Sequence, residues 1–473
     1  MKRFIASCVT FSVVLASCAS KKSQINNNNQ TSSDVAFWLT KGDKSVLLKK
    51  QDVALNFGTA ANTHKTITVD ENQTYQSVDG FGYTLTGGSA TLINQLPEQE
   101  KDALLKELFS TEDNAIGVSY LRVSIGASDL SAKVFTYNDL PTGETDVNME
   151  RFSIAEEMTD LVPVLKKILA INPNIKILGS PWTPPIWMKT NKAFKGGSLL
   201  PEFYQAYANY FVKYLAAMKA QGITIDAITI QNEPLHPGNT PSLLMLANEQ
   251  ANFIKTALGP TFQKAGLKTK IILYDHNADR PDYPMTILAD AEASKYVDGS
   301  AFHLYGGKID ALSQVHNAYP DKHIYFTEQW VGGPGNFAED LKWHVSTLIV
   351  GATRNWSRNV LEWNLAADAN YNPHTPDGGC TNCLGAITIA PAVTRNVAYY
   401  VIAHASKFVR PGAVRINSSE DATLSNVAFK TPDGKKALIV MNTSNTDQTF
   451  NISYQGKLVT PTLPAGAAGT FVW

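Results

Sequence analysis

Length and charge set the first limits on this chain. Its 473 residues are enough for a large hydrophobic core and for more than one domain. The 41 basic and 42 acidic residues give a formal net charge of −1. No basic excess indicates binding to nucleic acid and no acidic excess indicates a disordered tail, so we expect no nucleic-acid partner.

The N-terminus has the features of an export signal. Lys2 and Arg3 form a short basic region, and the apolar stretch 4–16 is too short to span a bilayer. The sequence LASC at 15–18 resembles the lipobox of bacterial lipoproteins. This resemblance implies that residues 1–17 are a signal peptide and that Cys18 carries lipid. The alternative is an ordinary secretory signal with an incidental cysteine. Either way we expect an exported protein. When Cys18 carries lipid, we expect the protein to contact a membrane only through this N-terminal anchor. The anchored protein then lies in the periplasm or at the cell surface, and we favour the outer membrane.

The next two segments differ in composition. Residues 18–33 are polar and of low complexity, which is typical of a flexible tether. Residues 34–75 contain runs in which apolar and polar residues alternate, such as THKTITVD at 63–70. This period of two predicts antiparallel strands, but too few of them for an independent core.

Residues 76–408 repeat one pattern, in which a short apolar strand, a loop and a longer amphipathic segment follow one another. The predicted strands are 76–83, 118–125, 175–180, 225–231, 270–275, 299–304, 323–327 and 360–365. The predicted helices are 98–109, 156–170, 200–220, 243–257, 285–293, 310–318, 337–352 and 394–406. Three glycines are expected to end helices: Gly222, Gly259 and Gly266. Eight strands alternating with eight helices predict an α/β fold, the (β/α)8 or TIM barrel.

An open doubly wound sheet would also alternate strands and helices. Such a sheet usually has a glycine-rich nucleotide-binding turn after its first strand. The sequence DGFGYTLTGG at 79–88 is rich in glycine, but it lacks the spacing and the downstream acid of a dinucleotide site. We interpret these glycines as a tight loop at the mouth of the barrel and expect no cofactor.

The C-terminal residues 409–473 again alternate at period two, with turn pairs such as Asp433-Gly434 between the runs. Both ends of the chain therefore predict antiparallel β structure. We expect one β-sandwich, built from 34–75 and 409–473 and fused to the barrel.

Of the four cysteines, Cys8 lies in the predicted signal peptide and Cys18 is the predicted lipidation site, so two remain for the folded part. Cys380 and Cys383 are separated by two residues, and an exported protein favours a local disulfide between them. A metal site needs two further ligands, and His374 is the nearest candidate. A thioredoxin-type role lacks its fold pattern. We expect the disulfide and no metal.

Two glutamates follow apolar strands of the predicted barrel. Glu233 ends AITIQNE at 227–233, and Glu328 ends HIYFTE at 323–328. The C-terminal ends of barrel strands form the active site of this fold, so strands four and seven bring both carboxylates to one rim. A single glutamate at a strand end is as well explained by a structural salt bridge. Two carboxylates facing across one pocket suit glycoside hydrolysis, with one as proton donor of raised pKa and the other as ionised nucleophile.

At this point the sequence resembles glycoside hydrolase family 30, within the clan of (β/α)8 retaining glycosidases. Asn232-Glu233-Pro234 and Thr327-Glu328-Gln329 match the clan's two catalytic motifs. Further motifs follow in the family's order along the barrel: YLRV at 120–123, SD at 128–129, SPWTPP at 180–185, HLY at 303–305 and EWNLA at 362–366. The ordered set is far more specific than the Asn-Glu-Pro motif taken singly. The family's sandwich, made from both termini, agrees with the pattern above.

The resemblance implies roles for individual residues. Glu328 is the nucleophile and Glu233 the acid/base. Asn232 binds the sugar 2-hydroxyl, and Arg122 keeps Glu328 ionised. Tyr305 donates to the nucleophile. The alternatives are a rim salt bridge for Arg122 and plain packing for Tyr305.

The same resemblance implies a first sugar subsite. Asp129 grips hydroxyls there, and Trp182 and Trp363 cover apolar faces of the sugar, although a core tryptophan is the alternative for each. His303 is expected to bind and orient rather than to catalyse. Trp330 lines a further subsite.

The glycoside itself is less determined. The family includes glucosylceramidases, β-glucosidases, β-xylosidases and endo-β-1,6-glucanases. After the eighth strand the glucosylceramidases have Gly-Gly-Pro-Asn-Trp, whereas this chain has GGCTNC at 378–383, which resembles the β-1,6-glucanase branch. We therefore predict an endo-β-1,6-glucanase acting on β-1,6-glucan. The alternatives are an exo-acting β-glucosidase or glucosylceramidase acting on another β-glucoside, or an inactive carbohydrate-binding lipoprotein. A nucleotide-dependent oxidoreductase is more distant.

Overall fold

The computed structural model describes Met1 and residues 33–473. The predicted signal peptide 1–17, the lipidation site Cys18 and all but the last residue of the tether 18–33 lie outside the described residues. No helix of the described part is long and apolar enough to cross a bilayer.

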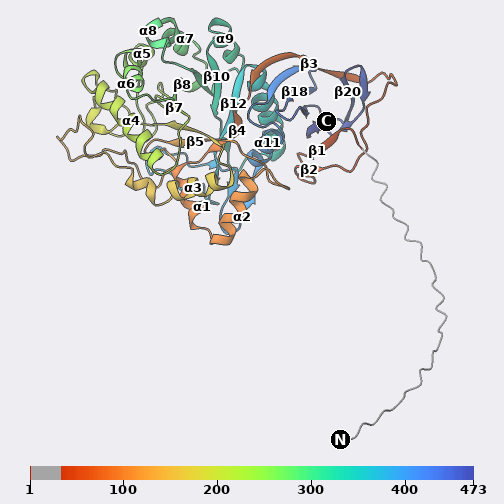
Figure 1. Cartoon of the computed structure of the whole chain (residues 1–473), viewed down its shortest axis with the longest axis horizontal. Helices are drawn as coiled ribbons and strands as arrows, with labels where there is room; N and C mark the ends of the chain where they lie inside the picture. The colour runs from red at the N-terminus through yellow and green to blue at the C-terminus, as the bar shows by residue number, and fades with distance from the viewer. Residues whose placement is uncertain (2–32) are drawn as a thin grey trace. The chain divides into compact units, whose positions relative to one another are not determined.

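Eight parallel strands close into a barrel, in the order β10-β12-β4-β5-β6-β7-β8-β9. Their bounds are β4 Gly80–Thr84, β5 Tyr120–Ser124, β6 Lys176–Ser180, β7 Ala227–Thr229, β8 Lys270–Ala278, β9 Gly299–Gly307, β10 His323–Glu328 and β12 Ser357–Asn364. Each strand overlaps one of the eight predicted segments. The fold class is therefore confirmed as a TIM barrel (Figure 1).

Helices surround the barrel on its outer face (Figure 1). They are α1 Gly87–Gln95, α2 Glu98–Phe109, α3 Leu161–Ile171, α4 Tyr204–Ala220, α5 Ala247–Phe253, α6 Gly259–Lys264, α7 Asp282–Ala289, α8 Ala291–Ser294, α9 Ala311–Ala318, α10 Phe337–Trp343 and α11 Val397–Ser406. Short 3-10 turns cover Ala155–Met158, Ile186–Met188 and Pro201–Phe203, and π-helical turns cover Ile254–Leu258 and His344–Ala352.

The glycine-rich segment 79–88 differs from the prediction. It is not a loop, because Gly80–Thr84 is strand β4 and Gly87 begins helix α1. A β-carbon on Gly82 would lie 1.8 Å from the carbonyl oxygen of Tyr120 on β5. The glycine therefore permits a close approach of two barrel strands, a use that is invisible in the local pattern.

Gly259 is a second correction, because it does not end a helix. The helical chain continues from α5 through the π-helical turn Ile254–Leu258 into α6, which begins at Gly259. A β-carbon on Gly259 would lie 2.3 Å from the ring of Tyr296, so close packing explains the glycine. Gly222 and Gly266 do follow α4 and α6, with positive φ of 81° and 65°.

Both termini contribute to the β-sandwich. Its ten strands follow the order β2-β1-β23-β19-β18-β17-β3-β20-β21, with β22 paired to β20. They are β1 Ala36–Thr40, β2 Lys49–Lys50, β3 Lys65–Ser77, β17 Val414–Ser418, β18 Leu424–Lys430, β19 Lys436–Asn442, β20 Gln448–Tyr454, β21 Lys457–Val459, β22 Thr462–Leu463 and β23 Ala468–Val472. Phe450 of β20 packs on Phe471 of β23 with ring centroids 5.9 Å apart, although these strands are not neighbours in the sheet. The sheet therefore wraps around its own apolar core.

Helix α11 lies between the barrel and the sandwich (Figure 1). All ten of its residues are buried. His404 bridges the two terminal segments of the sandwich, because its ring contacts the hydroxyls of Thr40 and Thr470 at 2.8 and 2.9 Å. Burial lowers the pKa of His404 to about 3, so this bridge is uncharged.

Candidate active site

A cavity of about 400 Å³ lies at the C-terminal ends of the barrel strands. Ten of the residues predicted from the sequence line it: Asp129, Trp182, Asn232, Glu233, Tyr305, Glu328, Trp330, Trp363, Cys380 and Cys383. Arg122 and His303 are fully buried and contact the glutamates from behind. The structure therefore brings all the predicted site residues that it describes into one region.

Glu233 follows β7 in a constrained loop. The strand ends at Thr229, and Glu233 itself has a positive φ of 46°, which is unusual for a residue with a side chain. Its backbone N–H donates to the carbonyl of Asp275 at 3.0 Å. His303 Nδ1 lies 3.3 Å from Glu233 Oε1. The loop therefore holds the carboxyl at the cavity wall.

Glu328 is the last residue of β10, and both of its oxygens accept hydrogen bonds. Arg122 Nη1 donates to Oε2 at 2.6 Å, and Tyr305 Oη donates to Oε1 at 2.9 Å. A second nitrogen of Arg122, Nη2, donates to Asn232 Oδ1 at 2.6 Å. Because charged and strong donors occupy both oxygens, the ionised form of Glu328 is favoured.

The two carboxylates face each other across the cavity. An oxygen of Glu233, an oxygen of Glu328 and a nitrogen of His303 all lie within 4.8 Å of one another. Retaining glycosidases have carboxyl groups about 5–5.5 Å apart, and inverting enzymes about 6.5–9.5 Å apart, to hold a water molecule. The separation here fits a double displacement with a covalent intermediate.

Carboxylates this close cannot both ionise freely, so the pair shares one proton at intermediate pH. Burial raises the pKa of Glu328, whereas the hydrogen bond and charge of His303 lower that of Glu233 against its own burial. This order is the opposite of the predicted one, in which the donor has the raised pKa. The hydrogen bonds decide the reacting form, because both oxygens of Glu328 face donors, while no donor from residues 33–473 binds Glu233 Oε2. The reacting form therefore has the proton on Glu233.

Comparison with known proteins agrees with this geometry. The profile of the glycosyl hydrolase family 30 TIM-barrel domain matches residues 78–409, and that of the family 30 beta sandwich domain matches 412–471. The chain belongs to glycosyl hydrolase family 30.

Three relatives illustrate the range of this family. The solved structure of the endo-β1,6-glucanase BT3312 superposes with a TM-score of 0.85 at 37% identity, covering 93% of this chain and 99% of that one. An endo-1,6-β-D-glucanase of Neurospora crassa is 34% identical over 444 residues, which is 86% of this chain and 90% of the relative. The lysosomal acid glucosylceramidase of Mus musculus is 30% identical over 436 residues, which is 86% and 83% of the two chains.

One wall of the cavity in this family 30 hydrolase is the segment after β12. Cys380 and Cys383 form a disulfide there, and β14 Cys383–Leu384 pairs with β11 Val331–Gly332, directly after the Glu328 strand. The backbone N–H of Thr375, in the same segment, donates to the backbone carbonyl oxygen of Asp129 at 2.8 Å. Burial and the neighbouring glutamates raise the pKa of Asp129 to about 7. The segment after β12 therefore contacts a predicted sugar-binding residue directly.

The two predicted subsite tryptophans are both buried and cavity-lining. Trp182 and Trp363 are 1% and 3% exposed, and their ring centroids lie 5.5 Å apart. The guanidinium of Arg122 lies 4.8 and 5.7 Å from these ring centroids. Trp182 and Trp363 are thus core residues and candidate subsite residues at once, because their rings pack on Arg122 and still border the cavity.

Several residues around the site were missed. His236, Asn239, His276 and Asn277 also line the cavity, and Asp275 lies directly beneath it. Asp275 ends the predicted strand 270–275, so the same signal that identified Glu233 and Glu328, an acid after an apolar strand, was present in the sequence.

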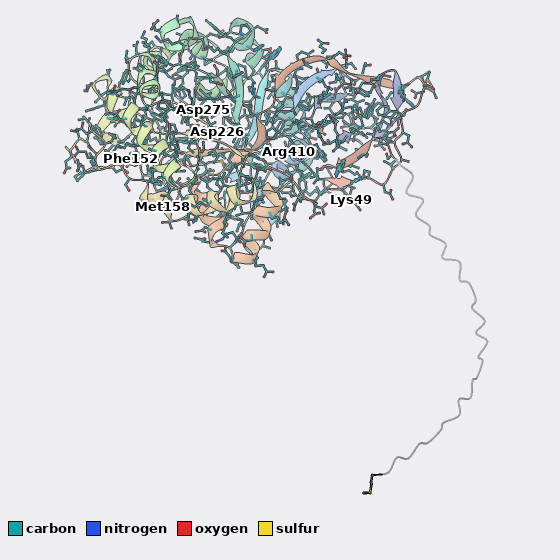
Figure 2. The ribbon with its side chains drawn as sticks, in the orientation of Figure 1. Lys49, Phe152, Met158, Asp226, Asp275 and Arg410 are labelled. Carbon is teal, nitrogen blue, oxygen red and sulfur yellow. A yellow bond between two sulfur atoms is a disulfide. The ribbon has the colours of Figure 1, made fainter. Side chains whose placement is uncertain are left out.

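A larger cavity, of about 570 Å³, lies at the opposite end of the barrel. Asp226, labelled in Figure 2, lines it and pairs with Lys176 at 2.9 Å. The neighbouring Lys270 pairs with Asp298 at 3.5 Å. These ion pairs join the starts of adjacent strands, as expected of the stabilising end of a TIM barrel.

Proposed function

We propose that this protein is a retaining endo-β-1,6-glucanase that cleaves β-1,6-glucan. One observation carries the proposal: two carboxylates within 4.8 Å of one another at the cavity, one of them held ionised by Arg122 and Tyr305. An inactive carbohydrate-binding protein has no need for this pair, so the geometry favours an enzyme.

The reaction proceeds in two displacements. Glu328 attacks the anomeric carbon while Glu233 transfers its proton to the glycosidic oxygen, which leaves a glycosyl-enzyme and a Glu233 carboxylate. His303 hydrogen-bonds to Oε1 of Glu233, so Oε2 is the oxygen that carries the proton. The Glu233 carboxylate then takes a proton from water, which attacks the same carbon and releases Glu328.

Substrate contacts follow from the same arrangement. Because Arg122 occupies the side-chain oxygen of Asn232, the amide nitrogen of Asn232 is directed to the sugar 2-hydroxyl. Asp129, Trp182 and Trp363 form the subsite for the sugar that is attacked. Trp330 extends the aromatic lining on the side of β11.

The glucan specificity rests on the relatives and on the disulfide wall. Identity is 34–37% to the named β-1,6-glucanases and 30% to the mouse glucosylceramidase. The disulfide between Cys380 and Cys383 lies on the cavity wall, where the glucosylceramidase motif has no cysteine pair.

Product analysis tests this function. The chain without residues 1–18 is incubated with β-1,6-glucan, and products are separated by chromatography beside a Glu328→Gln variant. We expect a ladder of β-1,6 oligosaccharides for the parent and a loss of at least about 1,000-fold in turnover, with glucan still bound, for the variant. Glucose alone would show an exo-enzyme. No product from the glucan, with hydrolysis of glucosylceramide, would replace the proposal by a glucosylceramidase.

We also propose that the enzyme is exported and anchored through lipid on Cys18, which the LASC sequence at 15–18 supports. Metabolic labelling of the full chain with a radioactive fatty acid tests this anchor. We expect label in the parent and none in a Cys18→Ala variant. An unlabelled parent found free in the medium would contradict the anchor and leave an ordinary secretory signal.

A further inference from the structure

Asp275 is a buried carboxylate that no substrate atom can reach. Its side chain is 0% exposed and lies within the barrel (Figure 2). Five donors surround it, with Arg122 Nη2 at 2.8 Å, Ser180 Oγ at 2.7 Å and Thr229 Oγ1 at 2.7 Å on Oδ2. On Oδ1 they are His303 Nε2 at 3.1 Å and Thr327 Oγ1 at 2.6 Å. Such a complete set of donors stabilises the ionised form, and the pKa of Asp275 is held well below its usual range against its burial, mainly by Arg122.

The backbone is bent to place this carboxylate. Tyr274 and Asp275 have positive φ values of 70° and 64°, which residues with side chains rarely adopt. The pairing of β8 with β9 shifts at the same point, where Tyr274 lies opposite Ala301 and His276 opposite Phe302. Asp275 is thus the extra residue of a β-bulge, a feature that redirects a side chain and recurs next to active sites.

Two cations connect Asp275 to the two glutamates. Arg122 binds Asp275 and Glu328 through different nitrogens, at 2.8 and 2.6 Å. His303 binds Asp275 through Nε2 at 3.1 Å and faces Glu233 through Nδ1 at 3.3 Å. Because a carboxylate accepts only, the contact with Asp275 keeps a proton on Nε2 and fixes the orientation of the ring.

We propose that Asp275 is a positioning residue that holds both catalytic glutamates in their working geometry, through Arg122 for Glu328 and through His303 for Glu233. This inference rests on the proposed function. The arrangement of charged groups around Asp275 also balances the charge of the site. Arg122 and protonated His303 offset ionised Asp275 and Glu328, and the remaining proton resides on Glu233.

The ionisation of His303 follows from its neighbours. The charged and titratable groups around its ring are Glu233, Glu328, Asp275, His276 and Tyr305. The carboxylates among them raise the pKa of His303 to about 9 despite its burial. His276 is neutral in the working range, because burial lowers its pKa to about 4.

The substitution Asp275→Asn removes the charge and keeps the shape. We expect kcat to fall about 100-fold and KM to change less than about threefold, because Asp275 touches the positioning groups and not the substrate. The alkaline limb of the kcat/KM profile is expected to move to higher pH. Without Asp275 the pKa of His303 falls, neutral His303 no longer lowers the pKa of Glu233, and Glu233 keeps its proton to higher pH.

A matched control uses the other end of the barrel. Asp298 also accepts from a histidine, His323, at 3.0 Å and from a tyrosine, Tyr325, at 2.6 Å. Asp298→Asn is the same chemical change far from the cavity, and we expect its kcat to stay within about twofold of the parent. The positioning role is wrong if Asp275→Asn folds with a melting temperature like that of Asp298→Asn and either keeps kcat within threefold of the parent or leaves the alkaline limb unshifted.

Two further measurements keep the test decisive. An aryl glucoside with a very acidic leaving group needs no proton from Glu233 in the first displacement, the step that kcat/KM reports. A large residual loss in kcat/KM for Asp275→Asn therefore shows the connection through Arg122 to Glu328, and no loss would remove that connection. If Asp275→Asn does not fold, an NMR titration of the imidazole of His303 in the parent replaces it. Protonation that persists to about pH 9 supports the network, and titration near pH 6.5 overturns it.

Failure of the proposed function gives a different result. If the parent enzyme is inactive on β-1,6-glucan but hydrolyses the aryl glucoside, only the assigned substrate is wrong. The Asp275→Asn comparison then proceeds on the aryl glucoside through the loss in kcat/KM alone, because the alkaline limb depends on the proton of Glu233, which this substrate does not need. A loss of activity that appears in Asp275→Asn and not in the parent, on whichever substrate the parent accepts, tests the role of Asp275 and not the assigned substrate.

Discussion

Tyr305 shows what a single hydroxyl contributes at this site. Its Oη donates to Glu328 Oε1 at 2.9 Å, while the residue as a whole is 40% exposed at the mouth of the cavity. The hydrogen bond stabilises the ionised nucleophile, and Arg122 does the same from the buried side. Loss of the Tyr305 hydroxyl therefore makes the ionised form of Glu328 less stable, while the hydrogen bond from Arg122 remains.

We expect Tyr305→Phe to lower kcat about 10- to 100-fold, the effect of one hydrogen bond to a charged group. The acidic limb of the pH profile is expected to move to higher pH. Removing a donor to the carboxylate raises the pKa of Glu328, so Glu328 becomes protonated and inactive at a higher pH than in the parent. A kcat/KM profile checks both changes.

Tyr325→Phe is the control for this change, because Tyr325 Oη donates to Asp298 at the opposite end of the barrel. We expect an unchanged profile for this variant. An acidic limb that is the same in Tyr305→Phe as in the parent would show that Tyr305 does not contribute to the ionisation of Glu328.

At the scale of elements, the segment after β12 forms part of the active site. It reaches back to β11 through the pairing of Val331 with Leu384 and of Gly332 with Cys383. The disulfide also closes a very short loop, so in the chain-entropy view it adds at most about 2 kcal/mol to the free energy of unfolding. Its larger effect is local, because both cysteines line the cavity together with Asp129.

We expect a variant with both Cys380→Ser and Cys383→Ser to show a KM raised about fivefold, with kcat within about twofold of the parent. The loop must then be ordered when glucan binds, at a cost of about 1 kcal/mol, and the machinery of Glu233 and Glu328 is not touched. Steady-state kinetics with and without a reducing agent measure this effect. Equal KM values for oxidised enzyme, reduced enzyme and variant would show that the wall is held without the disulfide.

At the scale of the whole molecule, one face of the sandwich packs on the barrel and extends the barrel's core, while the other face encloses the sandwich's own core. Phe81 of β4 packs edge to face on Phe429 of β18, with ring centroids 6.4 Å apart. Both rings are completely buried. Arg410, at the junction of barrel and sandwich in Figure 2, donates to the carbonyl of Ser406 at the end of α11 at 2.8 Å. The sandwich thus completes the barrel rather than being attached by a linker.

We therefore expect a chain that ends at residue 409 to lose soluble expression and activity. Truncation exposes Phe81 and the buried face of α11, and it leaves His404 without its partner Thr470. Deletion of residues 1–32 is the control and is expected to keep full activity. Soluble yield, circular dichroism and turnover of the two truncated chains are the measurements. A soluble, active barrel would show that the barrel does not need the sandwich face that packs on it.

The sequence by itself determined the barrel, the sandwich and the two glutamates. Alternating strands and helices are local patterns, and so is an acid that follows an apolar run such as 227–230 or 323–327. Solvation of a carboxylate at a strand end is a property of that strand alone, which is why Glu233 and Glu328 stood out. The approximate positions of the eight barrel strands followed for the same reason, although their bounds differ by up to four residues.

Only the tertiary structure decided how these groups act on one another. The separation of Glu233 and Glu328 depends on closure of eight strands, and the role of Gly82 depends on a carbonyl of the neighbouring strand. Asp275 has the same local signal as the glutamates, yet a β-bulge with positive φ buries it among five donors. Contacts between residues distant in the chain set distances, burial and pKa values, and a local pattern contains none of these.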